Sequence, residues 1–228
     1  MVRFTQKKFG KTKPFHFLID GCNLTKKLMN ISDVIEARRS VKNFDPEHIM
    51  PEEDLAELIR LTKLAPSSFN MQNYRLLVVR DMEIRKQIRN VAWDQAHVTD
   101  SSVLFILCAD LKAHQEDGSR YWSHAPQEVQ DIIGPMIKPF YEGNERLIRD
   151  EAIRSTGLAG MTLMLAAKGL GYDSCPMIGF DSEKVAELIK LPPHYALSFM
   201  IPVGMKTQNG WDRGPRLSDD IVVSYDKF

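Results

Sequence analysis

The stretch VLFILCA, residues 103–109, is a continuous run of apolar side chains with the length of a β-strand. It lacks the alternation of a half-exposed strand, so it predicts a strand that is covered on both faces. Strand-like segments also occur in YRLLVVR (74–80), within GLGYDSCPMIGFD (169–181) and in ALSFMIPVG (196–204). These four segments are far apart in the sequence, and none of them forms an obvious hairpin with another.

Helical patterns fill the intervals between these strands. The first is NISDVIEARRS (30–40), in which Ser32 or Asp33 can cap the start, and the others cover residues 51–65, 82–93, 144–168 and 182–191. The small residues in the second half of segment 144–168 predict close packing against another helix.

The least regular part of the chain is residues 111–143, which we expect to form a partly helical excursion over the body. A few strands among many helices predict an α+β sandwich in which helices wrap a central sheet. We expect one domain over residues 29–228. Residues 1–28 lack clear periodicity and are expected to be an N-terminal extension.

Composition excludes several classes of protein. Lys plus Arg is 30 and Asp plus Glu is 30, so no single-sign field is available to hold nucleic acid or an acidic membrane. An odd number of distant cysteines, Cys22, Cys108 and Cys175, argues against a disulfide framework and for a reducing compartment. The N-terminus fails as a secretory signal, and the sequence contains neither CxxC nor HExxH. We therefore expect a cytoplasmic protein without a metal site.

A cluster of cations lies in EARRSVKNFDPEH, residues 36–48. Arg38 and Lys42 are four residues apart, so they share a face if the helical turn continues, and Ser40 adds a hydroxyl between them. A phosphate group needs two or three cationic donors together with a hydroxyl or an amide. Cations at the C-terminal end of a helix also complement its dipole, so this segment alone leaves both interpretations open.

Three further stretches carry polar or conformationally special residues. In LAPSSFNMQNYRLLVV (64–79), Asn70 and Gln72 offer amide edges that suit a planar heterocycle, although such residues also make ordinary loops. In SCPMIGFD (174–181), Gly179 lets the backbone approach a flat ligand, whereas Cys175 is expected to be a buried structural thiol. WDRGPRLS (211–218) holds Arg213 and Arg216, which either reach a phosphate or are simply solvated.

Taken in order, these stretches resemble the FMN-dependent nitroreductase superfamily, particularly its NAD(P)H oxidase/nitroreductase branch. RRSVKNFD is similar to the superfamily's Arg-Arg-Ser-x-Arg/Lys-x-Phe segment, and APSSFNMQNY to Ala-Pro-Ser-Ser-x-Asn-x-Gln-Pro-Trp. WDQAHV resembles a segment with a flavin-contacting Gln or Asn, and GLGYDSCPMIGFD resembles Gly-Leu-Gly-x-x-x-x-Pro-x-x-Gly-Phe. GPRLS matches the terminal basic segment. One departure is that Asn73 and Tyr74 replace the usual Pro-Trp.

The resemblance implies a mostly antiparallel central sheet and an intertwined homodimer with two FMN sites at the subunit interface. It assigns the phosphate and ribityl chain to Arg38, Arg39, Ser40, Lys42, Arg213 and Arg216. Pro66, Ser67, Ser68 and Asn70 would approach the ring from the partner subunit, and Gln95 would reach its pyrimidine side. Pro176, Met177, Ile178 and Gly179 would run along the ring, and Phe69, Tyr121 and Trp122 would face the substrate.

The resemblance also implies the chemistry. NADH or NADPH would deliver a hydride to FMN, and a nitroaromatic, a quinone or a related small molecule would then be reduced in a ping-pong cycle. No protein side chain is expected to act as a nucleophile or general base. Two alternatives stay open: another flavin reaction on the same scaffold, such as dehalogenation or flavin breakdown, and a flavin-binding module without turnover.

Overall fold

The computed structural model describes residues 30–228, so the expected N-terminal extension lies outside the described residues. The strands are β1 (Tyr74–Val79), β2 (Val103–Asp110), β3 (Asp173–Ser174) and β4 (Tyr195–Gly204). The helices are α1 (Ile31–Ala37), α2 (Glu52–Thr62), α3 (Met82–Asn90), α4 (His97–Asp100), α5 (Gln127–Tyr141), α6 (Glu145–Gly169), α7 (Ser182–Leu188) and α8 (Asp219–Val222). Short 3-10 turns occur at Ser68–Asn70, Ala113–Gln115 and Gly118–Tyr121.

The four strands form one antiparallel sheet in the order β1-β2-β4-β3. Strands β2 and β3 follow each other in the sequence but are not adjacent in the sheet, where β4 lies between them. The α+β fold and the mostly antiparallel sheet expected from the sequence are therefore confirmed.

Strand β2 lies in the middle of the sheet, and every one of its residues is buried. Successive side chains of a strand point to opposite faces. Phe105 and Leu107 accordingly join the core beneath α2 and α6, whereas Leu104 and Ile106 join the core that holds residues of α3, α4 and α7. The apolar run 103–109 thus supplies both cores, as its sequence predicted.

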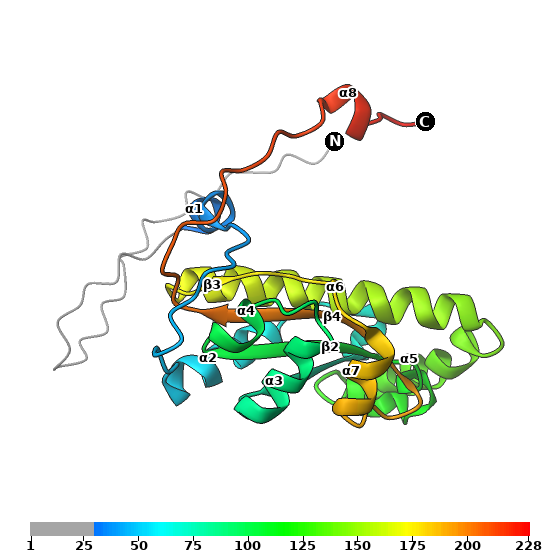
Figure 1. The fold of residues 1–228 in the computed structure, drawn as a ribbon. Coiled ribbons are helices and arrows are strands. Elements are labelled where there is room, and N and C mark those ends of the chain that lie inside the picture. The colour runs from blue at the N-terminus through cyan, green and yellow to red at the C-terminus, as the bar shows by residue number, and fades with distance from the viewer. Residues whose placement is uncertain (1–29) are drawn as a thin grey trace, which may run out of the picture.

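Helices cover both faces of the sheet. Figure 1 shows the long helix α6 along one side of the sheet and α3 with α7 along the other.

The Asn144 side chain caps the first turn of α6, in agreement with the helix expected from residue 144.

One local expectation was wrong. The first helix is capped by Asn30, whose side chain accepts a hydrogen bond from the Asp33 amide, rather than by Ser32 or Asp33. The expected packing of segment 144–168 against another helix is confirmed, because α6 contacts α2, and Ala159 and Ala167 share a buried core with Leu58. Gly160 faces the sheet, where an added Cβ would lie 2.3 Å from the Phe199 ring of β4. Gly157 has nothing within 4 Å of an added Cβ.

The region expected to be an irregular excursion contains the 15-residue helix α5, which includes Pro135 and Pro139. This helix packs tightly against the turn Gly118–Tyr121, where a Cβ on Gly118 would come within 2.3 Å of the Gly134 carbonyl oxygen. Ile137 and Tyr141 of α5 share a buried cluster with Met71 and Ile148, so the excursion packs on the body.

The chain after β4 leaves the body. Figure 1 shows it passing α1 and continuing outward to α8, and every side chain from Trp211 to Phe228 is exposed. Several of these exposed side chains are large and apolar, among them Trp211, Leu217, Ile221 and Tyr225. Among residues 30–228, no helix is both long and apolar enough to cross a membrane.

The two glycines of α6 provide a matched test of this packing. Gly157→Ala is expected to raise the free energy of unfolding by about 0.5–1 kcal/mol, because alanine favours a helix and its methyl group meets nothing. Gly160→Ala is expected to lower it by about 1–3 kcal/mol, because the methyl group overlaps Phe199. Urea unfolding of both variants measures the difference, and equal shifts would contradict the packing described.

Candidate functional site

The cationic segment is extended where it meets the sheet. Helix α1 ends at Ala37, and Arg38 already has extended backbone angles. Ser40 forms a parallel bridge with Ser174 of β3, and the Val41 amide donates to the Ser174 carbonyl. The expectation that Arg38 and Lys42 share a continuing helical turn was therefore wrong.

A hollow of about 560 Å³ opens beside this segment. All six residues predicted to hold a phosphate and ribityl chain line it: Arg38, Arg39, Ser40, Lys42, Arg213 and Arg216. We call it the cationic hollow. Its other wall is the segment that follows β4, which approaches so closely that a Cβ on Gly210 would lie 2.8 Å from the Ser40 carbonyl oxygen.

The cations of the hollow have different hydrogen-bond partners. Arg213 donates to the Ile35 carbonyl at 2.8 Å and Arg39 to the Arg38 carbonyl at 3.0 Å, so both help to cap the end of α1. The side chains of Arg38 and Lys42 make no hydrogen bond or ion pair within residues 30–228. Arg38 Nη1 and Ser174 Oγ are buried without a partner, an arrangement that is costly unless a ligand completes it.

Electrostatics favour an anion in the cationic hollow. The pKa of Arg213 is lowered by burial and by the nearby cations Arg39, Arg216 and Arg38. Asp212 is the only carboxylate among the residues that line the hollow. A bound anion would relieve this repulsion, and the donors present fit a phosphate monoester.

The thiol of Cys175 lies beside the same cations. Burial raises its pKa, and Lys42 and Arg38 only partly oppose this effect. The side chain is buried, as the sequence predicted, and a thiol held in its protonated form is a poor nucleophile.

The loop predicted to follow a flavin ring continues from β3. Met177 exchanges backbone hydrogen bonds with Met200 in the middle of β4, while the Ile178 side chain is exposed. Gln95 Nε2 donates to the Gly179 carbonyl at 2.8 Å and to the Ala92 carbonyl at 3.0 Å. The structure therefore brings Gln95 to the loop 176–179, with Oε1 left free to accept a hydrogen bond.

Trp93 is a residue of this region that the sequence reasoning missed. Its indole lies against Gly179, where an added Cβ would come within 2.4 Å of Trp93 Cζ3. Trp93 and Asp94 both have left-handed backbone angles, and Arg89 holds Asp94 in an ion pair at 2.6 Å. Its place two residues before Gln95 in WDQAHV was the only sequence signal.

Loop 66–70, which was predicted to reach the flavin ring of a partner subunit, is hydrogen-bonded to the excursion of residues 111–143. Ser67 Oγ accepts from the Gln72 amide, and Tyr141 donates to Ser68 Oγ at 2.7 Å. Asn70 Nδ2 donates to the Tyr121 carbonyl at 2.8 Å, so this amide group does not stand free as a ligand edge.

Three aromatic residues, Phe69, Tyr121 and Trp122, lie at this contact between the loop and the excursion. Trp122 Nε1 donates to the Phe69 carbonyl at 3.0 Å, and Phe69 has a left-handed backbone. Tyr121 is buried and donates through its hydroxyl to the Ala113 carbonyl. Phe69 and Trp122 are half-buried, and Pro66 is exposed at the start of the loop.

The strand register separates this loop from the cationic hollow. Loop 66–70 leads into Tyr74, which pairs with Ala109 near one end of β2. The cationic hollow lies next to Ser174, whose partner Val203 pairs with Val103 at the other end of β2. The six residue steps from Val103 to Ala109 correspond to about 20 Å, and β1 and β3 are opposite edges of the sheet, about 14 Å apart. Within one chain, the residues of the cationic hollow and those of loop 66–70 are therefore too far apart to form a single site.

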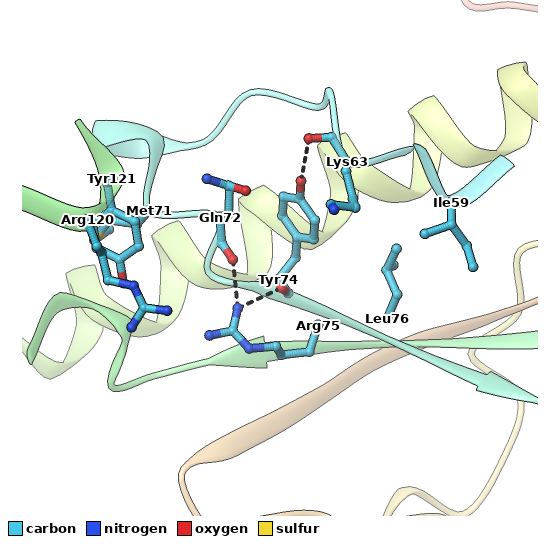
Figure 2. A pocket seen from close by; sticks show the side chains of 9 residues that line it. All are labelled: Ile59, Lys63, Met71, Gln72, Tyr74, Arg75, Leu76, Arg120 and Tyr121. Carbon is cyan, nitrogen blue, oxygen red and sulfur yellow. Dashed lines mark hydrogen bonds between the residues drawn. The ribbon is translucent and has the colours of Figure 1, made fainter. Parts of the chain in front are cut away.

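A second hollow, of about 600 Å³, lies behind loop 66–72. Figure 2 shows Arg75 between the carbonyl groups of Gln72 and Tyr74, with the Tyr74 hydroxyl directed at the Lys63 carbonyl. Arg75 also pairs with Asp110 at 2.5 Å, and Arg120 pairs with Glu116. These two arginines are already paired and leave Lys63 as the other cation of this hollow, so it suits an anion less well than the cationic hollow does.

Comparison with known proteins places the chain in a family. The model described as "Nitroreductase family" matches residues 35–205, and the chain belongs to this family. Protein DrgA of Synechocystis is 48% identical over 181 residues, which cover 79% of this chain and 86% of DrgA. A Bacillus subtilis protein named "Putative NAD(P)H nitroreductase MhqN" is 32% identical over 205 residues, covering 87% of this chain and 100% of MhqN.

Solved structures agree with this assignment. A nitroreductase of Exiguobacterium sibiricum, crystallised in complex with FMN, superimposes with a TM-score of 0.81 at 27% identity, covering 87% of this chain and 98% of that one. The ydfN nitroreductase of Bacillus subtilis superimposes with a TM-score of 0.80 at 32% identity, covering 85% and 97%. The nitroreductase-like fold is thus established.

The contact between Gln95 and Gly179 predicts a pH-dependent variant. Gln95→Glu would place a carboxylate against two carbonyl oxygens that cannot donate, so folding would raise the pKa of the new carboxyl group above about 4.3. The variant should be nearly as stable as the parent below that pH. It should then lose about 1–3 kcal/mol as the pH rises through the raised pKa.

Unfolding in urea at pH 4 and pH 7.5 measures this loss. Gln87→Glu, at an exposed position of α3, is the matched control and should show little difference between the two pH values. An equal loss for Gln95→Glu at both pH values would mean that the Gln95 amide does not hold the loop.

Proposed function

We propose that the protein is an FMN-dependent oxidoreductase that takes a hydride from NADH or NADPH and reduces a small organic acceptor. The observation that carries the proposal is the cationic hollow, in which Arg38 Nη1 is buried without a hydrogen-bond partner among the described residues and Lys42 adds a second unpaired cation. Membership of the nitroreductase family and the FMN held by a similar solved structure support it.

The residues of the chain divide the task of holding FMN. Arg38, Lys42 and Ser40 would bind the phosphate group, while Arg39 and Arg213 keep the end of α1 in place. The loop 176–179, braced by Gln95, would run along the ring. FMN, when bound, accepts a hydride and passes on two electrons, and the chain provides orientation and positive charge.

The acceptor class we propose is a nitroaromatic or a quinone, reduced after the oxidised nicotinamide has left. A quinone takes up two electrons and two protons, which correspond to one hydride from NAD(P)H and one proton from water. No titratable side chain is required to act as a base in this scheme. The exposed Ile178 and Trp93 side chains would border the space above the ring.

We further propose that the working unit is a homodimer. An FMN whose phosphate is bound at Arg38 would have its ring near Met177, which pairs with Met200 in the middle of β4. Phe69 precedes β1, at the opposite edge of the sheet and beyond the end of β2 that is far from the cationic hollow. Only a second chain can bring its loop 66–70 to that ring. The exposed apolar side chains of the segment after β4 also have the character of a subunit contact.

The FMN assignment makes a measurable prediction. The purified protein should be yellow, or should become so with added FMN, and Arg38→Met should weaken FMN binding about tenfold to hundredfold because a buried charge-assisted contact is lost. Arg80→Met, at an arginine paired with Glu52 outside the cationic hollow, is the matched control. Titration of flavin fluorescence gives both dissociation constants, and equal values would contradict the assignment.

The dimer predicts that two defective chains restore each other. Phe69→Gly removes the ring at a left-handed position that glycine adopts without strain, and Arg38→Met impairs the phosphate contact. In a mixed dimer, one site receives both changes and the other receives neither. Refolding the two variants together should therefore give up to about half of the parent activity in mixed dimers. Activity no greater than the sum of the separate variants would exclude a site shared between chains.

A further inference from the structure

The second hollow, behind loop 66–72, has cations on two sides and no acidic residue in its wall. Figure 2 shows Arg120 and Lys63 on opposite sides of Gln72. Neither aspartate nor glutamate is among the residues that line the hollow. Its volume, about 600 Å³, lies in the range of cavities that hold small organic ligands. The hollow therefore has the size and the charge for an anionic organic molecule.

The three cations of this hollow differ in what already binds them. Arg75 is committed to the fold, because it pairs with Asp110 and donates to two backbone carbonyl groups. Among residues 30–228, the ammonium group of Lys63 makes no hydrogen bond or ion pair. Arg120 pairs with Glu116, but both side chains are more than half exposed, so water weakens this pair and a phosphate group can replace the carboxylate. Two cations are thus available to a ligand.

The side of the hollow that holds Lys63 also has an apolar wall. Figure 2 shows Ile59 of α2 and Leu76 of β1 beside Lys63. Both apolar side chains pack on the core and stay half-buried, so their exposed parts can contact a planar ring without any change in the core. A purine base next to a phosphorylated ribose fits this combination of apolar surface and cation.

The side that holds Arg120 lies next to the loop that we propose reaches the flavin of a second chain. Asn70 Nδ2 donates to the Tyr121 carbonyl at 2.8 Å, and Trp122 Nε1 donates to the Phe69 carbonyl at 3.0 Å. Arg120 directly precedes these two residues of the excursion. A ligand bound at Arg120 can therefore extend past Phe69 toward the ring.

We propose that the second hollow binds the phosphorylated adenosine end of NADPH, with the diphosphate at Arg120 and the 2′-phosphate at Lys63. This inference rests on the proposed function, and it makes NADPH the preferred donor over NADH, which lacks the 2′-phosphate. The donor must leave before the acceptor enters. Exposed cations that bind a phosphate weakly suit this task, whereas the partly buried Arg38 suits the FMN that stays bound.

The test compares NADPH with NADH in steady-state oxidation by the holoenzyme, with menadione as the acceptor. The kcat/KM of the parent should be about fivefold to tenfold higher for NADPH, as one partly exposed contact between a cation and a phosphate gives. Lys63→Met should reduce this ratio to about twofold or less, whereas Lys63→Arg, which keeps the charge, should retain it. Arg120→Met should lower kcat/KM for both donors and leave the ratio at the parent value. Lys86→Met, at an exposed lysine of α3, is the matched control and should change neither quantity.

A second measurement does not depend on turnover. Calorimetric titration of the oxidised holoenzyme, in which FMN occupies the cationic hollow, compares adenosine 2′,5′-bisphosphate with adenosine 5′-monophosphate. The bisphosphate should bind the parent about fivefold to tenfold more tightly, and Lys63→Met should lose this difference. No preference in the parent, or a preference that Lys63→Met keeps, would overturn the inference. Conversion of Lys63→Met to monomers, seen by light scattering, would overturn it as well, because the hollow would then be a subunit contact.

The two proposals fail separately. A holoenzyme that oxidises NADH and NADPH with equal kcat/KM retains the proposed function and loses this inference. A protein that oxidises neither donor beyond one equivalent loses the proposed function, whatever the titrations show.

Discussion

The parallel backbone contact between Ser40 and Ser174 is the constraint on which the candidate site depends. It fastens the chain that follows α1 to the edge of the sheet, so that Arg38 and Lys42 lie beside the segment that follows β4. The strand that carries Ser174 continues into loop 176–179 and therefore also sets the direction of that loop. One short contact thus relates the cationic hollow to the surface along which a planar ring can lie.

A second constraint is the length of β2. Because its eight residues are buried on both faces, the sheet must be covered by helices on both sides. The same length separates the cationic hollow from loop 66–70, which lies at the other end and the other edge of the sheet. This separation is the reason for our proposal that a second chain completes the site.

Local patterns in the sequence identified most elements of the fold, because apolar periodicity is a local property. The run 103–109, the helix from residue 144 and the strand at 196–204 all occur close to the expected bounds. The errors arose where distant contacts decide. Arg38 is extended where Ser40 pairs with Ser174, and α5, which contains Pro135 and Pro139, is anchored in a buried cluster with residues outside the excursion. Trp93 was missed because its contact with Gly179 joins residues far apart in the chain.

The sequence by itself determined the residue types of the site: cations around a serine, a polar loop, a glycine-bearing loop and a terminal basic segment, in the order typical of the family. The tertiary structure decided which of these meet. Arg38, Lys42 and Arg216 line one hollow. Arg39 and Arg213 donate hydrogen bonds at the end of α1, and Asn70 donates one to the excursion. The physical reason is that a side chain has a fixed number of donors and acceptors. Which partners bind these donors and acceptors depends on strand register and on packing between distant segments, and no short stretch of sequence determines either of these.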